Sequence, residues 1–241
     1  MAELAALVQE LRDPGIALVL DFVLNHSADE HDWARVAAPG DLDFQAFYVM
    51  VDDCTIPQQY LPMLREIFTD RAGDAFTWRL VVQGPNGGKW VWTTFYPFQW
   101  DLNYRNPAVL TAILGEIAFL ADRGVEVLRL DALPFLCKTL GTTCEHQPEA
   151  HRVVRALNAF ARIAAPALVV KSKAIVHPDD VASYVAAEES PLCYRPLFIV
   201  LLWDALATRD TRHRRYALET RFRLPPGTAS VNDVRCHDDI A

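Results

Sequence analysis

Several features that would mark particular classes of protein are absent from this 241-residue chain. No apolar run approaches the roughly 20 residues that a helix needs to cross a bilayer. The first residues lack the basic start and continuous apolar core of a signal peptide. The formal net charge is −8 and the sequence contains no basic cluster, so nucleic acid is not an expected partner. These absences favour a globular protein that contacts neither a membrane nor nucleic acid.

The cysteine pattern also does not indicate a cross-linked framework. There are five of them, an odd number, and no two have CxxC spacing. The pattern therefore predicts neither a disulfide framework nor a zinc site, and a reducing cytoplasm is the expected location. With 51% hydrophobic residues, a chain of this length can bury a sizeable core.

The rest of the chain is organised around the stretch from Val125 to Leu133, VEVLRLDAL. A near-continuous apolar run predicts a strand covered on both faces, and catalytic side chains emerge at the C-terminal ends of such strands in parallel barrels. Arg129 and Asp131 share one face of this strand, and the guanidinium favours an ionised carboxylate. Asp131 is therefore a candidate nucleophile. A buried structural ion pair in another α/β protein fits this stretch equally well.

Alternating helix and strand patterns on both sides of this stretch predict an α/β fold. An amphipathic helix at residues 1–13 precedes a turn and a strand in IALVLDFVLNHS, residues 16–27. Later segments repeat the alternation, with helices at 106–120 and 148–164, a strand in ALVVKSKAIVH, a short strand and two helices between 191 and 223, and a last strand in SVNDVRCHDD.

Three polar residues lie at or beyond the end of the first of these strands. Asp21, Asn25 and His26 suggest ligand contact, because a buried strand gains nothing from polar side chains. The alternative for each residue alone is structural: the first two cap loops, and His26 is a hydrogen-bonded histidine at the rim.

Between residues 27 and 103 the α/β alternation stops, which predicts a small inserted subdomain. Five of the six tryptophans fall here, and KWVWTTFYPFQWDLN leads into Gln99, Asp101 and Asn103. Exposed aromatic rings beside amides and carboxylates suit sugar rings, which have an apolar face and a rim of hydroxyls. Packing in an aromatic core is the commoner explanation for most of these tryptophans.

Taken together, these strand ends resemble the ordered motifs of glycoside hydrolase family 13, the α-amylase superfamily. DFVLNH, LRLDAL, KSKAIVHP and RCHDDI resemble its four barrel motifs, and QWDLN resembles its extra motif. LREIFTD, KWVWTTF, FQWDLNY, GTTCEHQPEAH, IAAPA and KSKAIVHPDD are most similar to the amylosucrase branch. The resemblance implies a partial (β/α)8 barrel of about strands 3 to 7, formed by residues 1–26 and 104–241, with 27–103 as the inserted B-type domain.

The same resemblance implies an activity and a set of residues. A retaining transglucosidase of this branch would split sucrose, release fructose and extend an α-1,4-glucan, without a metal or an organic cofactor. Asp131 would be the nucleophile and Asp238 the carboxylate that steadies the transition state. The residues implied to contact substrate are Asp21, Asn25, His26, Arg129 and His237, with Arg65, Phe95 and Gln99 on the acceptor side.

Two departures from the family pattern leave a second hypothesis open. Lys173 occupies the position of the family's acid/base glutamate, where we expect it to pair with Asp131, and a misread codon is an alternative explanation. The motifs also predict that the first two strands, the eighth strand and the C-terminal β domain are absent, which would leave two exposed sheet edges. The chain is therefore either an enzyme that transfers the glucosyl unit or hydrolyses sucrose, or an inactive carbohydrate-binding remnant or gene fragment.

Overall fold

The computed structural model describes residues 2–65, 75–81, 87–173, 181–216 and 224–232. These residues belong to two compact units, each assembled from separate stretches of the chain. The first unit comprises residues 1–22, 117–131 and 151–241, and the second comprises residues 23–116 and 132–150.

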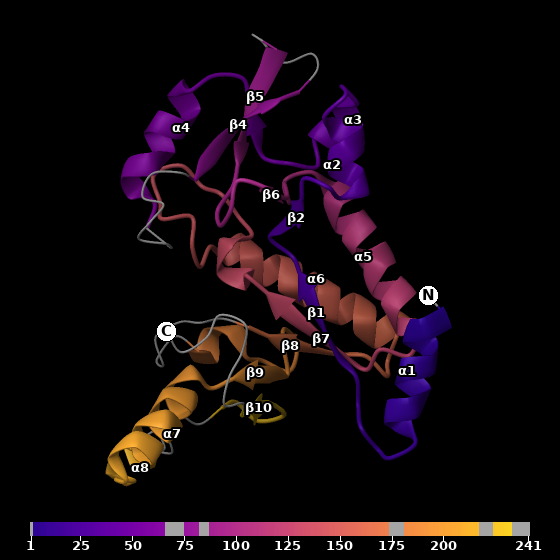
Figure 1. Ribbon diagram of the computed structural model, residues 1–241, viewed down its shortest axis with the longest axis vertical. Helices are drawn as coiled ribbons and strands as arrows, with labels where there is room; N and C mark the ends of the chain where they lie inside the picture. The colour runs from indigo at the N-terminus through magenta and orange to yellow at the C-terminus, as the bar shows by residue number, and fades with distance from the viewer. Residues whose placement is uncertain (1, 66–74, 82–86, 174–180, 217–223, 233–241) are drawn as a thin grey trace. The chain divides into compact units, whose positions relative to one another are not determined.

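The first unit is built on a five-stranded sheet whose strands are ordered β1-β7-β8-β9-β10 (Figure 1). Three neighbouring pairs, β7 with β8, β8 with β9 and β9 with β10, are parallel. The strands are β1 (Val19–Val23), β7 (Val127–Asp131), β8 (Val169–Ser172), β9 (Leu192–Tyr194) and β10 (Ala229–Val231). The helices are α1 (Ala2–Arg12), the end of α5 (Pro107–Ala121), α6 (Pro148–Ala164) from residue 151, η5 (Val181–Tyr184), α7 (Pro196–Thr208) and α8 (Arg212–Tyr216). This alternation confirms the predicted α/β fold.

Local periodicity explains how these elements bury their apolar residues. On α6, Val154, Leu157 and Ala161 are each at most 1% exposed, and their spacing of three and four residues places them on one helix face. On β7, Leu128 and Leu130 are fully buried, while Arg129 and Asp131 alternate with them on the other face. The sheet therefore directs apolar side chains to one side and a charged row to the other.

Strand β1 differs from the buried strand that the sequence suggested. It lies at one edge of the described sheet, opposite β10, and Val19 and Val23 are 43% and 38% exposed. An edge strand has a neighbour on one side only, so its apolar side chains are less covered. The two sheet edges predicted from the motifs are present in the described residues. Asp21 is also the middle residue of β1 and does not lie at its end.

The second unit contains two small sheets. Strands β2 (His26–Ala28) and β6 (Gln99–Asp101) pair antiparallel, and β3 (Met50–Val51), β5 (Gly88–Trp92) and β4 (Phe76–Leu80) form an antiparallel sheet in that order. Its helices are α2 (Asp32–Ala37), α3 (Leu42–Gln45), α4 (Thr55–Tyr60), η1 (Leu61–Met63), η4 (Leu133–Phe135) and the first part of α5. The predicted insertion, 27–103, lies within this unit, which also takes in residues on either side of it.

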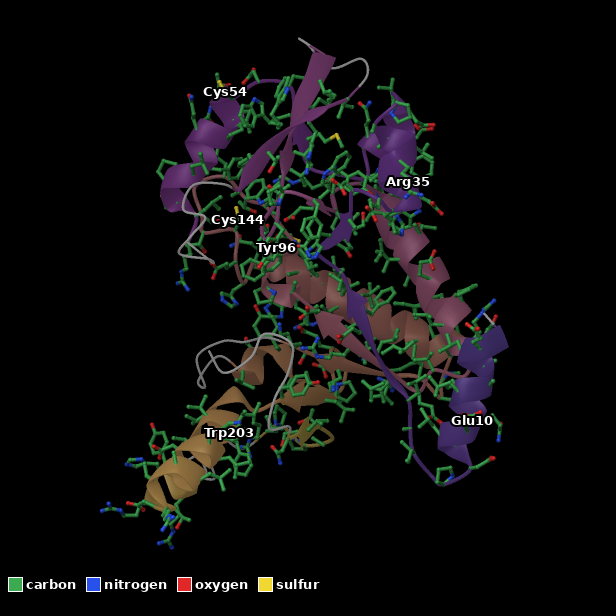
Figure 2. All side chains as sticks on the ribbon, in the orientation of Figure 1. Glu10, Arg35, Cys54, Tyr96, Cys144 and Trp203 are labelled. Carbon is green, nitrogen blue, oxygen red and sulfur yellow. The ribbon has the colours of Figure 1, made fainter. Side chains whose placement is uncertain are left out.

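Tryptophans of the second unit contribute to its core. Trp92, 2% exposed, packs with Phe76 and Cys144, and Trp100 is 3% exposed against Tyr48. Core packing therefore accounts for these two rings. Cys144 and the exposed Cys54 at the start of α4 are both free thiols (Figure 2). No helix in the described part of the chain is both long and apolar enough to cross a membrane.

Candidate active site

The charged face of the parallel sheet brings together residues from three neighbouring strands of the first unit. Arg129 on β7 lies directly opposite Lys171 on β8 in the parallel register. Asp131 and Lys173 follow two residues further along, and side chains two residues apart on a strand share a face. The sheet therefore aligns two carboxylates, counting Asp21 on β1, with three cations.

Arg129 is the centre of this charged row. It is 5% exposed, its Nη1 lies 2.7 Å from Asp21 Oδ1 and 3.8 Å from Asp131 Oδ1, and its Nε donates to the Tyr194 hydroxyl at 3.2 Å. Burial alone would lower the pKa of Arg129, but the hydrogen bond to Asp21 and the charge of Asp131 raise it above its ordinary value. The guanidinium is a fixed positive charge beside both carboxylates.

The predicted pairing of Lys173 with Asp131 is confirmed. Lys173 Nζ lies 3.0 Å from Asp131 Oδ1, and the two side chains are 11% and 14% exposed. A carboxylate held between a guanidinium and an ammonium is strongly favoured in its ionised form. The same ammonium, however, contacts Asp131 Oδ1, one of the two oxygens with which a nucleophilic carboxylate would attack.

Two members of this face, Lys171 and Tyr194, were not predicted as site residues from the sequence. Lys171, 4% exposed, donates from Nζ to the Tyr194 hydroxyl at 2.6 Å and lies 4.1 Å from the centre of the Tyr194 ring. Tyr194 thus accepts hydrogen bonds from two cations. The signal for Lys171 was its alternation with Lys173, whereas nothing local distinguished Tyr194 from any other strand tyrosine.

Directly after β7 the backbone makes an unusual turn. Ala132, the residue that follows Asp131, has φ 58° and ψ 30°, in the left-handed region. A residue other than glycine pays about 1–2 kcal/mol for this conformation. Backbone strain of this kind is concentrated at functional sites, where the surrounding structure holds it in place.

The second unit holds a further group of the predicted substrate residues. The His26 ring lies 5.2 Å from the Phe95 ring, centre to centre, and Phe95 lies 5.2 Å from Phe135. Asn25 is 1% exposed, and its Oδ1 accepts a hydrogen bond from Lys138 at 3.2 Å. His26 and Phe95, 69 residues apart in sequence, are therefore neighbours, and Asn25 is engaged by the protein itself.

The other predicted residues have less defined surroundings. Gln99 lies on β6, and its Oε1 is buried with no hydrogen-bond partner among the described residues. Arg65 is largely exposed, with Nη1 3.4 Å from Glu145 Oε2. His237 and Asp238 lie outside the described residues.

The fold and the charged face together define a class. A carboxylate at the carboxyl end of a parallel strand, as Asp131 is on β7, is the arrangement found in enzymes of the (β/α) barrel type. Residues 1–220 match the family model "Alpha amylase, catalytic domain". The chain belongs to this family, glycoside hydrolase family 13.

The proteins to which this chain is similar in sequence carry several names. The chain is 33% identical over 226 residues to a glucosylglycerate phosphorylase of Allomeiothermus silvanus, which is 92% of this chain and 39% of that protein. It is 33% identical over 185 residues to a trehalose synthase of Pimelobacter, which is 76% of this chain and 31% of that protein. A glucosylglycerate phosphorylase of Spirochaeta thermophila is 28% identical over 92% of this chain and 36% of its own length. The chain thus spans between about a third and two fifths of these relatives.

Solved structures support the fold. The sucrose 6F-phosphate phosphorylase of Thermoanaerobacter thermosaccharolyticum has a TM-score of 0.76 at 18% identity, over 98% of this chain and 46% of that one. A GH13_31 family enzyme has a TM-score of 0.66 at 21% identity, over 80% of this chain and 38% of its own. The prediction of an α/β fold that forms part of a (β/α)8 barrel is confirmed.

Proposed function

We propose that this protein belongs to the retaining glucosyl-transferring members of its family and that Asp131 is the nucleophile. The observation that carries the proposal is the place of Asp131: the last residue of β7, 14% exposed as a side chain and 3.8 Å from Arg129 Nη1. A fixed cation keeps the carboxylate charged until it attacks the anomeric carbon. Asp21 Oδ1 lies 2.7 Å from the same Nη1 of Arg129, and Asp238 is assigned by motif to the glucosyl hydroxyls.

In the reaction proposed, Asp131 forms a bond to the anomeric carbon as the bond to the leaving oxygen breaks. The leaving oxygen must gain a proton in this first step. In the second step an acceptor hydroxyl gives up its proton as its oxygen displaces Asp131, so the glucosyl unit is bonded to the acceptor with its configuration retained. The family's acid position is occupied by Lys173. An ammonium holds its proton too firmly at neutral pH to be a good donor.

For the donor we propose sucrose, with an α-1,4-glucan as product, as the amylosucrase-like motifs imply. The relatives are named for glucosylglycerate and trehalose, and all three compounds contain a glucosyl unit joined through its anomeric carbon. Release of fructose, glycerate or glucose from the three compounds distinguishes them. The proposal for sucrose is overturned if either of the other two is cleaved faster.

The nucleophile is tested with α-glucosyl fluoride, because fluoride leaves without general acid help. We expect the chain, or any longer protein that contains it, to release fluoride, and the Asp131→Asn variant to lose at least about 10³-fold of that rate. A matched control is Asp52→Asn, since Asp52 pairs with Lys89 in the second unit. Equal rates for the Asp131→Asn variant and the unsubstituted protein would refute the assignment.

A second candidate is a protein that binds an α-glucoside without turning it over. The contact between Lys173 and Asp131 supports this candidate, because it both masks the nucleophile and replaces the acid. Saturable sucrose binding with no fluoride release from glucosyl fluoride is the outcome that favours it over the enzyme.

A further inference from the structure

A buried lysine in the second unit has no task in the proposed reaction. Lys138 follows η4, is 8% exposed, and its Nζ lies 2.7 Å from Oδ2 of Asp101, which is fully buried. Desolvating two charges costs more than their attraction returns unless hydrogen bonds satisfy both partners. The surroundings of this pair therefore indicate what it does for the fold.

Those surroundings come from three separate segments of the chain. Lys138 Nζ donates to Asn25 Oδ1 at 3.2 Å, to Thr94 Oγ1 at 3.2 Å and to the backbone carbonyl of Phe135. Asp101 accepts from the backbone N–H of Thr94 at 3.0 Å and from the Thr94 hydroxyl. One ammonium thus holds together segments that are up to 113 residues apart in sequence.

Each of these segments carries one ring of a single aromatic row. The row consists of His26, next to Asn25; Phe95, next to Thr94; and Phe135 itself, with 5.2 Å between successive ring centres. His26 is also the antiparallel partner of Asp101 in the β2–β6 pair. Aromatic rings in fixed positions suit the apolar face of a pyranose ring.

We propose that Lys138 is a positioning residue that holds the aromatic row of His26, Phe95 and Phe135 in the geometry that receives a sugar ring. This rests on the proposed function, because a glucoside is the ligand of the row. Loops joined at one buried charge lose little entropy when the sugar binds, since their arrangement is already set. Sequence separation hides the connection, and the contacts of one side chain reveal it.

The test replaces the pair without leaving a buried charge unpaired. In the double variant Lys138→Met with Asp101→Asn, both charges are removed, a change that buried ion pairs often tolerate. Thr94→Val leaves the ion pair in place and breaks the hydroxyl link to the Phe95 segment. Lys89→Met is the matched control, because it removes an ion pair with Asp52 elsewhere in the same unit. Two readouts follow each variant: the nuclear Overhauser effect between the His26 and Phe95 rings, and sucrose binding by calorimetry.

The expected result is loss of the ring contact and sucrose binding weakened by about 10- to 100-fold in the double variant. Thr94→Val should weaken the ring contact, and Lys89→Met should change neither readout. An unchanged ring contact in whichever of the first two variants folds overturns the proposal, because Lys138 would then only stabilise the unit. If the contact is lost but the unsubstituted protein binds no sucrose, the positioning role stands and the proposed function fails.

Discussion

Replacing Lys173 by glutamate is the most informative single change in this protein. We expect the Lys173→Glu variant to release fructose from sucrose about 10²- to 10⁴-fold faster than the unsubstituted protein, because this is the usual contribution of a general acid. The new carboxyl would lie beside Asp131. Since two like charges in contact disfavour each other, the glutamate is favoured in the protonated form that can act as an acid.

The second part of the effect comes from freeing the nucleophile. At the 3.0 Å that separates Lys173 Nζ from Asp131 Oδ1, the Coulomb attraction is about 5 kcal/mol for an effective dielectric constant of about 20. Both side chains are largely buried, so desolvation offsets much of this and leaves about 1–3 kcal/mol. Removing that hold from the nucleophile corresponds to about 10- to 100-fold in rate.

Two substrates and one control variant separate the two contributions. Fructose release from sucrose needs both the acid and the nucleophile, whereas fluoride release from α-glucosyl fluoride needs only the nucleophile. Lys173→Met removes the ammonium without supplying an acid. It should therefore accelerate fluoride release by about 10- to 100-fold and leave fructose release far below that of Lys173→Glu.

One result would refute this reasoning directly. If the unsubstituted protein and Lys173→Glu release fructose at equal rates, and both are active, the proton donor lies elsewhere in the protein. The motif assignment of position 173 would then be wrong, and the ion pair with Asp131 would be structural.

Three substitutions and one labelling experiment test the structure itself. Gly124 has φ +85°, and an added Cβ would lie 2.9 Å from a Val8 methyl, so Gly124→Ala should lower the free energy of unfolding by at least about 1 kcal/mol. A Cβ added at Gly115, in the interior of α5, would have nothing within 4 Å, so Gly115→Ala should raise the free energy of unfolding by about 0.5–1 kcal/mol. Equal denaturant midpoints for the Gly124→Ala and Gly115→Ala variants would contradict this account. Tyr194→Phe removes the acceptor shared by two buried cations, which costs about 1–3 kcal/mol and should lower Tm by roughly 3 to 10 °C; an unchanged Tm would show that the hydroxyl is not needed. Burial raises the pKa of Cys137 to about 11, so about 0.1% of it is thiolate at pH 8. Iodoacetamide should label the exposed Cys54 before the half-buried Cys137, and Cys137 should react faster as the pH rises towards 11. Equal labelling of these two thiols at pH 8, measured by mass spectrometry, would contradict this account of Cys137.

Periodicity along the sequence was enough to predict most of the elements of the sheet unit. The helix at 148–164 is recovered as α6 with the same bounds, because its apolar residues recur every three or four positions, a property of the local chain. Asp131 was identified for a similar reason: an apolar run ending in a charge is visible without any knowledge of neighbouring strands. The motif order also led to the family, which the match over residues 1–220 confirms.

Other features depended on contacts between residues distant in sequence, which no local pattern encodes. The exposure of Val19 and Val23 on β1 depends on which strands lie beside it, and that is a matter of sheet order. Lys138 looked like any loop lysine until its partners, 37 and 113 residues away, were brought around it. The sequence by itself predicted most elements of the sheet unit, the family and the nucleophile candidate. Only the tertiary structure decided which charges meet, because the energy of an ion pair depends on distance and burial and these are set when separate segments pack together.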